Sequence, residues 1–301
     1  MSVSVSKLSK IYDEQKAVDG VTFDAKRGEV LGFLGPNGAG KSTTMKIITC
    51  FIPQSAGKAE VCGIDTLTNP NDVKKKIGYL PESNPLYHDM YVREYLKFIA
   101  GLHPNIKDKM KRVNEMIGVT GLEKERNKKI GALSKGYKQR VGLAQSMLHD
   151  PEVLIMDEPT SGLDPNQIVE VRKLIQQLGQ EKTVILSTHI MQEVQAMCNR
   201  VVIINKGKLV ANSSVEELKA KSTDAEVIAV GFKEHVAQRA LEQIRDVTRV
   251  EKSGPTSWKL YSKRNIQEDV FRFAVDNKLT VLSLSQERES LEDIFRQLTQ
   301  N

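Results

Sequence analysis

The 301-residue sequence has few cysteines, few aromatic residues and no long hydrophobic run. Its three cysteines, Cys50, Cys62 and Cys198, are odd in number and lack CxxC spacing, which argues against a disulfide framework and against a zinc site. Apolar runs such as residues 201–204 are far shorter than the ~18 residues of a membrane-spanning helix. Residues 1–10 lack the apolar segment of a signal peptide. We therefore expect a soluble chain with reduced cysteines.

Neither sign of charge dominates the sequence. Its 44 lysines and arginines exceed its 38 aspartates and glutamates by six, an excess that favours anionic partners such as nucleotides, nucleic acid or an acidic membrane surface without choosing among them. Hydrophobic residues make up 40% and charged residues 27%, close to globular averages, so extensive disorder is not expected. At ~150 residues per domain, the length predicts two domains, each with its own core.

Residues 1–222 show short runs of Val, Ile and Leu that alternate with helical patterns. This alternation predicts an α/β domain built from βαβ units around a largely parallel, buried sheet. The clearest strands are expected at residues 30–34, 153–156, 184–186 and 201–204. Apolar residues spaced three and four apart predict a helical insert at about residues 85–150. Ser213 and Ser214 are candidate caps of a helix that closes this domain, and the boundary is placed near Ser222.

The remaining residues, 223–301, predict a small α+β module. Their expected order is strand, helix, strand, strand, helix, strand and a final helix, which is the ferredoxin-like arrangement. The expected elements cover residues 227–232, 235–244, 247–252, 258–262, 266–275, 279–284 and 291–298. No internal repeat relates this module to the first domain.

Residues 35–43 form a glycine-rich segment between an expected strand and an expected helix, which is the context of a P-loop. Its members are Gly35, Pro36, Asn37, Gly38, Ala39, Gly40, Lys41, Ser42 and Thr43. The glycines let backbone N–H groups surround phosphates, while the helix N-terminus favours their negative charge. We expect Lys41 to reach the β- and γ-phosphates of ATP and the Ser42 hydroxyl to bind Mg²⁺. The competing interpretation is a simple glycine-rich turn.

Two adjacent carboxylates, Asp157 and Glu158, end the apolar run of residues 153–156. A strand tip can deliver both side chains to the metal ion of the P-loop. Asp157 is suited to hold the metal and Glu158 to orient the attacking water, because phosphoryl transfer needs positioning and charge neutralisation more than covalent catalysis. Taken alone, an Asp-Glu pair at the end of a strand is usually a turn or a cap, and the upstream P-loop reverses that preference.

Together with three further motifs, these residues resemble the ATP-binding subunit of an ABC transporter over most of residues 5–220. Residues 133–137 (LSKGY) occupy the position of the family's signature motif, residues 159–164 (PTSGLD) match the loop that joins two nucleotide sites, and His189 matches the switch histidine. The resemblance implies the α/β fold of a P-loop NTPase, an ABC-type nucleotide-binding domain with a helical subdomain. It also implies ATP and Mg²⁺ as cofactors and ATP hydrolysis coupled to transport.

The resemblance further implies a head-to-tail dimer, of two identical chains or of two paralogues, that encloses two ATP molecules. The residues expected to face the nucleotide of the other subunit are Ser134, Lys135, Gly136 and Tyr137. Asp164 lies in the loop that communicates between the sites, and Ser134 is also in an ordinary N-cap position. The signature departs from the family pattern at Lys135, where glycine is usual, and at Tyr137, where glutamine is usual. Lys135 would either add a cation beside the γ-phosphate or project into solvent.

Three side chains are the catalytic candidates of this resemblance: Lys41, Glu158 and His189. His189 would contact the γ-phosphate and hold Glu158 and the water in register, although a single histidine at a strand end is commonly structural.

Tyr12 lies 23 residues before Gly35, where the family places an aromatic side chain that stacks on adenine. The alternative for Tyr12 is local packing on an edge strand. Val18 is expected on the ribose side of the same pocket. Glu82 occupies the position of the family's glutamine that touches metal and water, and its carboxylate can still bind Mg²⁺.

Residues 290–295 (SLEDIF) and the preceding module resemble export-type subunits of the ABC-2 kind, and the LSKGY variant is most similar to gliding-motility ATP-binding subunits. The resemblance implies integral membrane permease subunits as partners, no nucleic-acid partner, and a place at the cytoplasmic face of the membrane. The terminal module would regulate or stabilise a dimer, or be a passive extension. Two alternative functions stay open: a mechanical ATPase acting on ribosomes or DNA, and a nucleotide-sensing module with little turnover.

Overall fold

The computed structural model describes residues 1–222, 226–288 and 290–299. The chain divides into two units, Met1–Val215 and Glu216–Asn301. The division lies at the start of helix α8 (Val215–Ser222), whereas the sequence pattern places it at the end of this helix. Most of α8 therefore belongs to the second unit. Within the described residues, no helix combines the length and the apolarity needed to cross a bilayer.

The first unit is built around a six-stranded sheet with the order β10-β9-β3-β8-β7-β6. Its strands are β3 (Val30–Leu34), β6 (Ile77–Leu80), β7 (Val153–Asp157), β8 (Thr183–Thr188), β9 (Arg200–Asn205) and β10 (Lys208–Ser214). All neighbours are parallel except β10, which pairs antiparallel with β9 at the edge. The four strands expected from apolar runs are β3, β7, β8 and β9, so the predicted largely parallel, buried sheet is confirmed.

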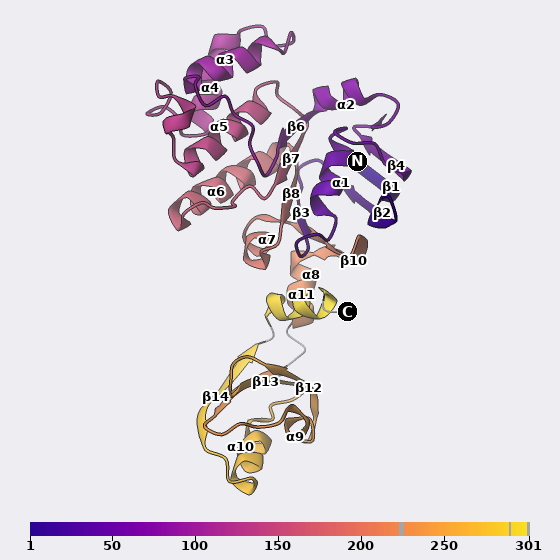
Figure 1. Cartoon of the computed structure of the whole chain (residues 1–301), viewed down its shortest axis with the longest axis vertical. Helices are drawn as coiled ribbons and strands as arrows, with labels where there is room; N and C mark the ends of the chain where they lie inside the picture. Colours follow the sequence, from indigo (N-terminus) through magenta and orange to yellow (C-terminus); the bar gives the residue numbers. More distant parts are fainter. Residues whose placement is uncertain (223–225, 289, 300–301) are drawn as a thin grey trace. The chain divides into compact units, whose positions relative to one another are not determined.

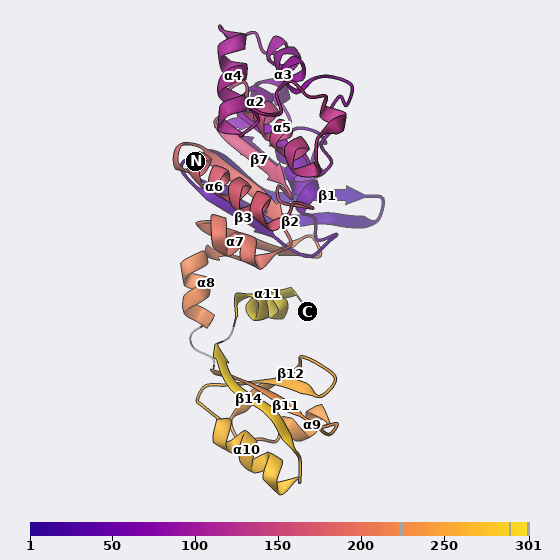
Figure 2. The same ribbon diagram turned by 90° about the vertical axis from the view of Figure 1, so that its left-hand side faces the viewer.

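Helices cover both faces of this sheet (Figures 1 and 2). They are α1 (Lys41–Ile48), α2 (Pro70–Lys76), α6 (Pro165–Glu181) and α7 (Met191–Met197). Side chains of β7 alternate between two cores: Val153 and Ile155 pack in the core that contains α1, and Leu154 and Met156 pack in the core that contains α6. Because both faces are covered, these strands are continuous apolar runs.

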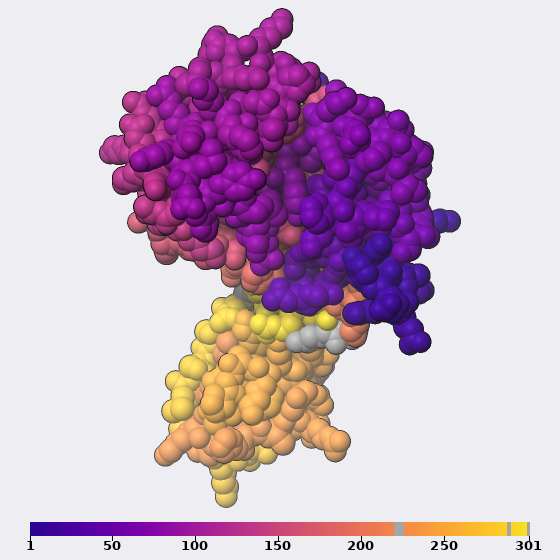
Figure 3. Space-filling view, turned by 45° about the horizontal axis from the view of Figure 1, so that its top comes forward, coloured from indigo at the N-terminus to yellow at the C-terminus, as the bar shows by residue number. Residues whose placement is uncertain are grey.

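A second sheet in this unit is antiparallel, with the order β2-β1-β4-β5, and no feature of the sequence singled it out. Its strands are β1 (Val3–Tyr12), β2 (Gln15–Ala25), β4 (Ala56–Val61) and β5 (Ile64–Asp65). In β1, Val3 and Val5 are buried while Ser6 is exposed, the alternation of a sheet with one covered face. This sheet packs with α1 and lies on the side of the unit opposite the segment of residues 85–150 (Figures 1 and 3).

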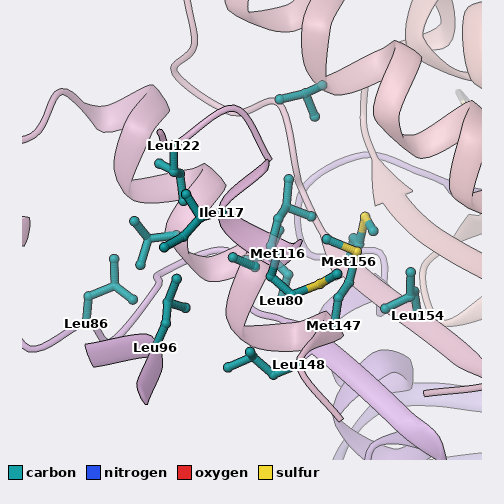
Figure 4. Packing of buried hydrophobic residues seen from close by; sticks show 14 of the residues in the cluster. Leu80, Leu86, Leu96, Met116, Ile117, Leu122, Met147, Leu148, Leu154 and Met156 are labelled. Carbon is teal, nitrogen blue, oxygen red and sulfur yellow. The ribbon is translucent and has the colours of Figure 1, made fainter. Parts of the chain in front are cut away.

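Residues 85–150 form the helical subdomain predicted from the sequence. Its helices are α3 (Val92–Gly101), α4 (Lys109–Val119), the 3₁₀ helix η1 (Ile130–Ala132) and α5 (Lys135–Met147). Their apolar side chains, such as Leu96, Ile117 and Met147, share one core with Met156 of β7 (Figure 4). The subdomain is thereby anchored on the strand that ends in Asp157.

The second unit contains a four-stranded antiparallel sheet with the order β12-β13-β11-β14. Its elements are β11 (Glu226–Phe232), α9 (Gln238–Leu241), β12 (Val247–Lys252), β13 (Ser257–Ser262), α10 (Gln267–Asp276), β14 (Val281–Arg288) and α11 (Leu291–Thr299). This order and topology confirm the ferredoxin-like module. Helix α9 is shorter than the expected residues 235–244, because Gln243 and Ile244 donate i→i−3 hydrogen bonds that form a turn instead of continuing an α-helix.

Candidate nucleotide-binding site

The loop between β3 and α1 is compact because its glycines have no side chain. A Cβ atom at Gly35 would collide with the carbonyl oxygen of Ile204, and one at Gly40 with that of Ala17. Gly40 also has a φ of +104°, in the left-handed region that favours glycine. The loop therefore turns tightly into the start of α1, whose first N–H groups have no acceptor inside the helix. This arrangement suits the binding of phosphates.

Lys41 begins α1, and its ammonium group lies inside the loop. Only 6% of the residue is exposed, and Nζ donates hydrogen bonds to the carbonyl oxygens of Gly35 (2.8 Å) and Pro36 (3.2 Å). The same Nζ is 3.7 Å from Oε1 of Glu158. Burial lowers the pKa of Lys41, and nearby carboxylates, chiefly that of Glu158, oppose this effect. A cation is thus held between the P-loop and a buried carboxylate.

Glu158 follows the last residue of β7 and is only 7% exposed. Its φ of +49° is uncommon for a residue with a side chain, and its N–H donates to both the carbonyl and the hydroxyl oxygen of Ser187, each at 3.2 Å. Nδ1 of His189 lies 3.0 Å from each carboxylate oxygen of Glu158. Burial raises the pKa of Glu158, while His189 and Lys41 partly offset this effect. The strained backbone and these contacts fix the direction of the carboxylate.

These side chains open onto one cavity of about 570 Å³, a size typical of small-molecule sites. The predicted residues that line it are Asn37, Gly38, Gly40, Lys41, Ser42, Thr43, Glu82, Glu158 and His189. The fold therefore brings the P-loop, a carboxylate at the end of β7 and a histidine after β8 to one place, although they are far apart in the sequence.

The cavity is also lined by residues that were not expected there. They are Gln15, Lys16, Ala17, Ser161, Lys206 and Gly207. The N–H of Gly207 donates to the carbonyl oxygen of Ala39 (3.0 Å), which places the turn between β9 and β10 against the P-loop. The sequence marks a turn at Gly207, but the position of that turn depends on the pairing of β9 with β3 and has no local signal.

Part of the expected ATP-binding set is not in the cavity wall: Tyr12, Val18, Gly35, Pro36 and Ala39. Val18, expected beside the ribose, is instead completely buried in β2, because it packs beneath Gly40 in the core shared with α1. Tyr12, expected to stack on adenine, lies at the end of β1 and is 46% exposed, with Nζ of Lys10 5.1 Å from its ring centre. Its strand partner Gln15 does line the cavity, so Tyr12 is next to the wall and not part of it.

The signature residues of the chain do not line this cavity. Ser134 is the N-cap of α5, and its Oγ accepts a hydrogen bond from the N–H of Tyr137 (3.4 Å). The side chain of Lys135 lies against Gly162, where Nζ fills the space that a Cβ atom would need. Lys135 is exposed and contacts the loop of residues 159–164 in its own chain, so its side chain lies at the surface as in the second of the two expectations.

Asp164, expected in the communication loop, is the N-cap of α6. Its Oδ1 accepts a hydrogen bond from the N–H of Gln167 (3.0 Å), and the side chain of Gln167 accepts one from the N–H of Asp164 (3.3 Å). This reciprocal pair is a capping box. The buried Gly136 of the signature packs against the same Gln167 side chain, so the start of α5 and the start of α6 are in contact.

Oxygen atoms around Lys41 suit a magnesium ion. Ser42 and Glu82 line the cavity, and the buried Asp157 ends β7 with its carboxylate accepting a hydrogen bond from the hydroxyl of Ser187. The charges of Asp157 and Glu82 both act on Lys41. Mg²⁺ prefers such oxygen donors and commonly binds one or two carboxylates together with substrate phosphates. Among the described residues, no group of three or more His, Cys, Asp or Glu side chains is placed to hold a metal ion by itself.

Comparison with known protein families matches residues 18–161 to the ABC transporter family and residues 214–299 to the C-terminal domain of DrrA1-3-like ATP-binding proteins. The bacitracin transport ATP-binding protein BcrA of Bacillus licheniformis is 34% identical, over 98% of this chain and 96% of its own length. This chain belongs to the ATP-binding subunits of ABC transporters. Its activity is ATP hydrolysis, and the predicted P-loop fold is confirmed.

This ABC ATPase is also similar to other ATP-binding proteins. The linearmycin resistance ATP-binding protein LnrL of Bacillus subtilis (strain 168) is 33% identical, over 99% of this chain and 98% of its own length. Among solved structures, cbiO1 of Clostridium perfringens, part of the ABC transporter complex cbiONQ, has a TM-score of 0.65 and 30% identity, over 73% of this chain and 91% of that chain.

Proposed function

We propose that this ABC ATPase powers the export of a compound through an integral membrane permease. The observation that carries the proposal is the similarity to BcrA and LnrL over almost the whole chain, since those proteins are named for bacitracin transport and linearmycin resistance. The similarity includes the C-terminal unit as well as the nucleotide-binding unit. Export in a resistance-type system is therefore the best-supported use of the hydrolysis.

The residues of the site bind and orient the reactants. The P-loop and Lys41 hold the β- and γ-phosphates of ATP. The residues that would hold Mg²⁺ are Ser42, Asp157 and Glu82. When bound, Mg²⁺ neutralises charge on the phosphates. Glu158 orients the attacking water, and His189, in contact with both of its oxygens, keeps the carboxylate in the required direction.

The complete site requires a second subunit in this proposal. The signature residues 134–137 do not line the cavity of their own chain, which supports their contacting the nucleotide of another subunit, either a second copy or a paralogue. The cbiO1 protein, described as part of a transporter complex, supports association with membrane subunits. Such a partner would hold this chain at the cytoplasmic face of the membrane, with Asp164 in the contact between the two subunits.

The gliding-motility subtype and the two alternative functions have less support than export. Neither BcrA nor LnrL carries a gliding-motility name, so that subtype stays a prediction from the sequence. A mechanical ATPase on ribosomes or DNA, or a sensor with little turnover, has less support, because the matches over both units are to transport subunits.

The proposal is tested by purifying a tagged Glu158→Gln chain in mild detergent with MgATP and identifying what remains bound at equal stoichiometry. The expected partner is a multi-spanning membrane protein, whose addition to the wild-type chain stimulates ATP hydrolysis. Lys41→Ala is the matched control. Because this variant should bind MgATP weakly, it should retain less of any partner whose binding depends on nucleotide. Ribosomes, DNA or no partner at all would overturn the export proposal.

A further inference from the structure

Glu193 is a buried carboxylate that the proposed mechanism does not use. It lies in α7, is only 2% exposed and is not part of the cavity wall. Its Oε2 accepts a hydrogen bond from Oγ1 of Thr188 (2.6 Å), and its Oε1 accepts one from Oγ1 of Thr160. Among the described residues, no lysine or arginine forms an ion pair with it. Burying a carboxylate without a cation is energetically costly even when two hydroxyl groups donate hydrogen bonds to it, which points to a role beyond packing.

The two threonines are close in sequence to Glu158 and His189, the two residues proposed to position the attacking water. Thr160 lies two residues after Glu158, and Thr188 directly precedes His189. Both are buried, with exposed fractions of 4% and 0%. Oγ1 of Thr188 also accepts a hydrogen bond from the N–H of Ile190 (3.1 Å), which holds the turn on the other side of His189. One carboxylate is thereby connected to both segments whose side chains meet in the Glu158–His189 contact.

The segment after Glu158 is held from a second direction. Nε2 of Gln139, in α5, donates a hydrogen bond to the carbonyl oxygen of Pro159 (3.1 Å). Glu158 itself has the left-handed backbone described above, a conformation that persists only where neighbouring contacts enforce it. Thr160 and Pro159 supply such contacts on the C-terminal side, so loss of the Thr160 hydroxyl would release one of them.

We propose that Glu193 is a positioning residue for ATP hydrolysis, which fixes Glu158 relative to His189 by accepting hydrogen bonds from Thr160 and Thr188. The proposal rests on the role of Glu158 in orienting water. A solely structural Glu193 would change the stability of the chain and leave the turnover of folded protein intact. A positioning role changes kcat more than KM, because nucleotide binding by the P-loop does not involve these hydrogen bonds.

The test compares Thr160→Val, which removes the hydroxyl at nearly constant volume, with Thr160→Ser, which keeps it. ATP hydrolysis is measured with the full-length chain at saturating and limiting MgATP. Thr160→Val should lower kcat about 10- to 100-fold and change KM by less than about twofold, since a small misplacement of a reacting group has effects of this size. Thr160→Ser should retain most of the wild-type kcat. Equal kcat values for Thr160→Val and wild type would overturn the proposal.

Glu193→Gln tests the other end of the same hydrogen bond. If Glu193 acts through Thr160, the double variant Glu193→Gln/Thr160→Val should lose less kcat than the product of the two single losses. Fully multiplicative losses would contradict the connection. The control is Thr120→Val, which removes a buried hydroxyl bonded to the carbonyl oxygen of Met116 in the helical subdomain and should leave kcat unchanged. Thermal unfolding of each variant confirms that folded protein is compared.

Failure of this inference is distinguishable from failure of the proposed function. If Glu158→Gln abolishes turnover while Thr160→Val and Glu193→Gln hydrolyse ATP normally, only the positioning role is wrong. If Glu158→Gln keeps normal turnover, Glu158 does not orient the attacking water, and the positioning role of Glu193, which depends on it, is wrong as well.

Discussion

Nδ1 of His189 lies 3.0 Å from both carboxylate oxygens of Glu158. The two residues follow neighbouring parallel strands, β7 and β8, whose ends meet at one edge of the sheet. When Glu158 is ionised, its carboxylate is only an acceptor, and the imidazole then donates its N–H in this contact. His189 therefore has a direct means of orienting Glu158.

His189→Ala should lower kcat about 10²-fold with a small change in KM, because Glu158 loses the partner that holds it while the P-loop is untouched. Steady-state ATP hydrolysis over a range of MgATP concentrations measures both constants. His88→Ala is the control, since His88 is exposed in the helical subdomain and should behave as wild type. An unchanged kcat for His189→Ala would show that the contact has no role in turnover.

Lys41→Ala should weaken MgATP binding about 10²-fold, because the P-loop loses its buried cation and the β- and γ-phosphates lose a charged donor. Equilibrium binding of a fluorescent ATP analogue measures the affinity. Lys46→Ala, in the same helix but exposed to solvent, should bind as tightly as wild type. Wild-type affinity in the Lys41 variant would place the phosphates elsewhere.

Removal of Mg²⁺ by a chelator should abolish hydrolysis, and added Mg²⁺ should restore it. Ser42→Ala should raise the Mg²⁺ concentration needed for half-maximal activity about 10-fold, because a hydroxyl ligand is lost. The matched control is Ser6→Ala on the exposed side of β1, for which no change is expected. Full activity with the chelator present would contradict a magnesium-dependent site.

The ion pair of Glu29 and Arg200 should make stability depend on pH. Oε1 of Glu29 accepts a hydrogen bond from Nε of Arg200 (2.7 Å). Burial alone would raise the pKa of Glu29, but the hydrogen bonds of Arg200 and of the Lys26 N–H, with the charge of Arg200, hold it below the usual 4.5. This contribution to stability is therefore fully present above pH 4.5 and is lost as the pH falls through the lower pKa of the folded state.

Urea unfolding at pH 7 and at acidic pH measures this effect. Glu29→Gln should lose less stability on acidification than the wild type, because it has no proton to take up at this position. Glu181→Gln, at an exposed glutamate, should follow the wild-type curve. Identical pH dependence in Glu29→Gln and wild type would mean that the pair does not contribute.

The features predicted correctly from the sequence are those with a local signal. The strands β3, β7, β8 and β9 are buried on both faces, and burial leaves continuous apolar runs. The P-loop also has a clear local signal, because a Cβ atom at Gly35 or Gly40 would collide with a backbone carbonyl oxygen and only glycine is tolerated there. The carboxylate of Glu158 is recognisable because it directly follows an apolar strand.

Features that depend on tertiary pairing could not be predicted. Gly207 reaches the P-loop only because β9 lies beside β3, which no short segment specifies. Val18 has an apolar side chain that is suited to a pocket wall and to a core equally well. In the structure β2 packs against α1, and Val18 is therefore part of the core. Lys135 contacts Gly162 because α5 and the loop after β7 are neighbours in space.

The most direct test of Glu158 as the water-orienting carboxylate is single-turnover hydrolysis by Glu158→Gln, measured together with MgATP affinity. The substitution keeps the size of the side chain and removes its charge. Affinity within about threefold of wild type and a hydrolysis rate about 10²- to 10⁴-fold lower are expected. Hydrolysis at a near-normal rate, in the assembled complex, would contradict this role for Glu158.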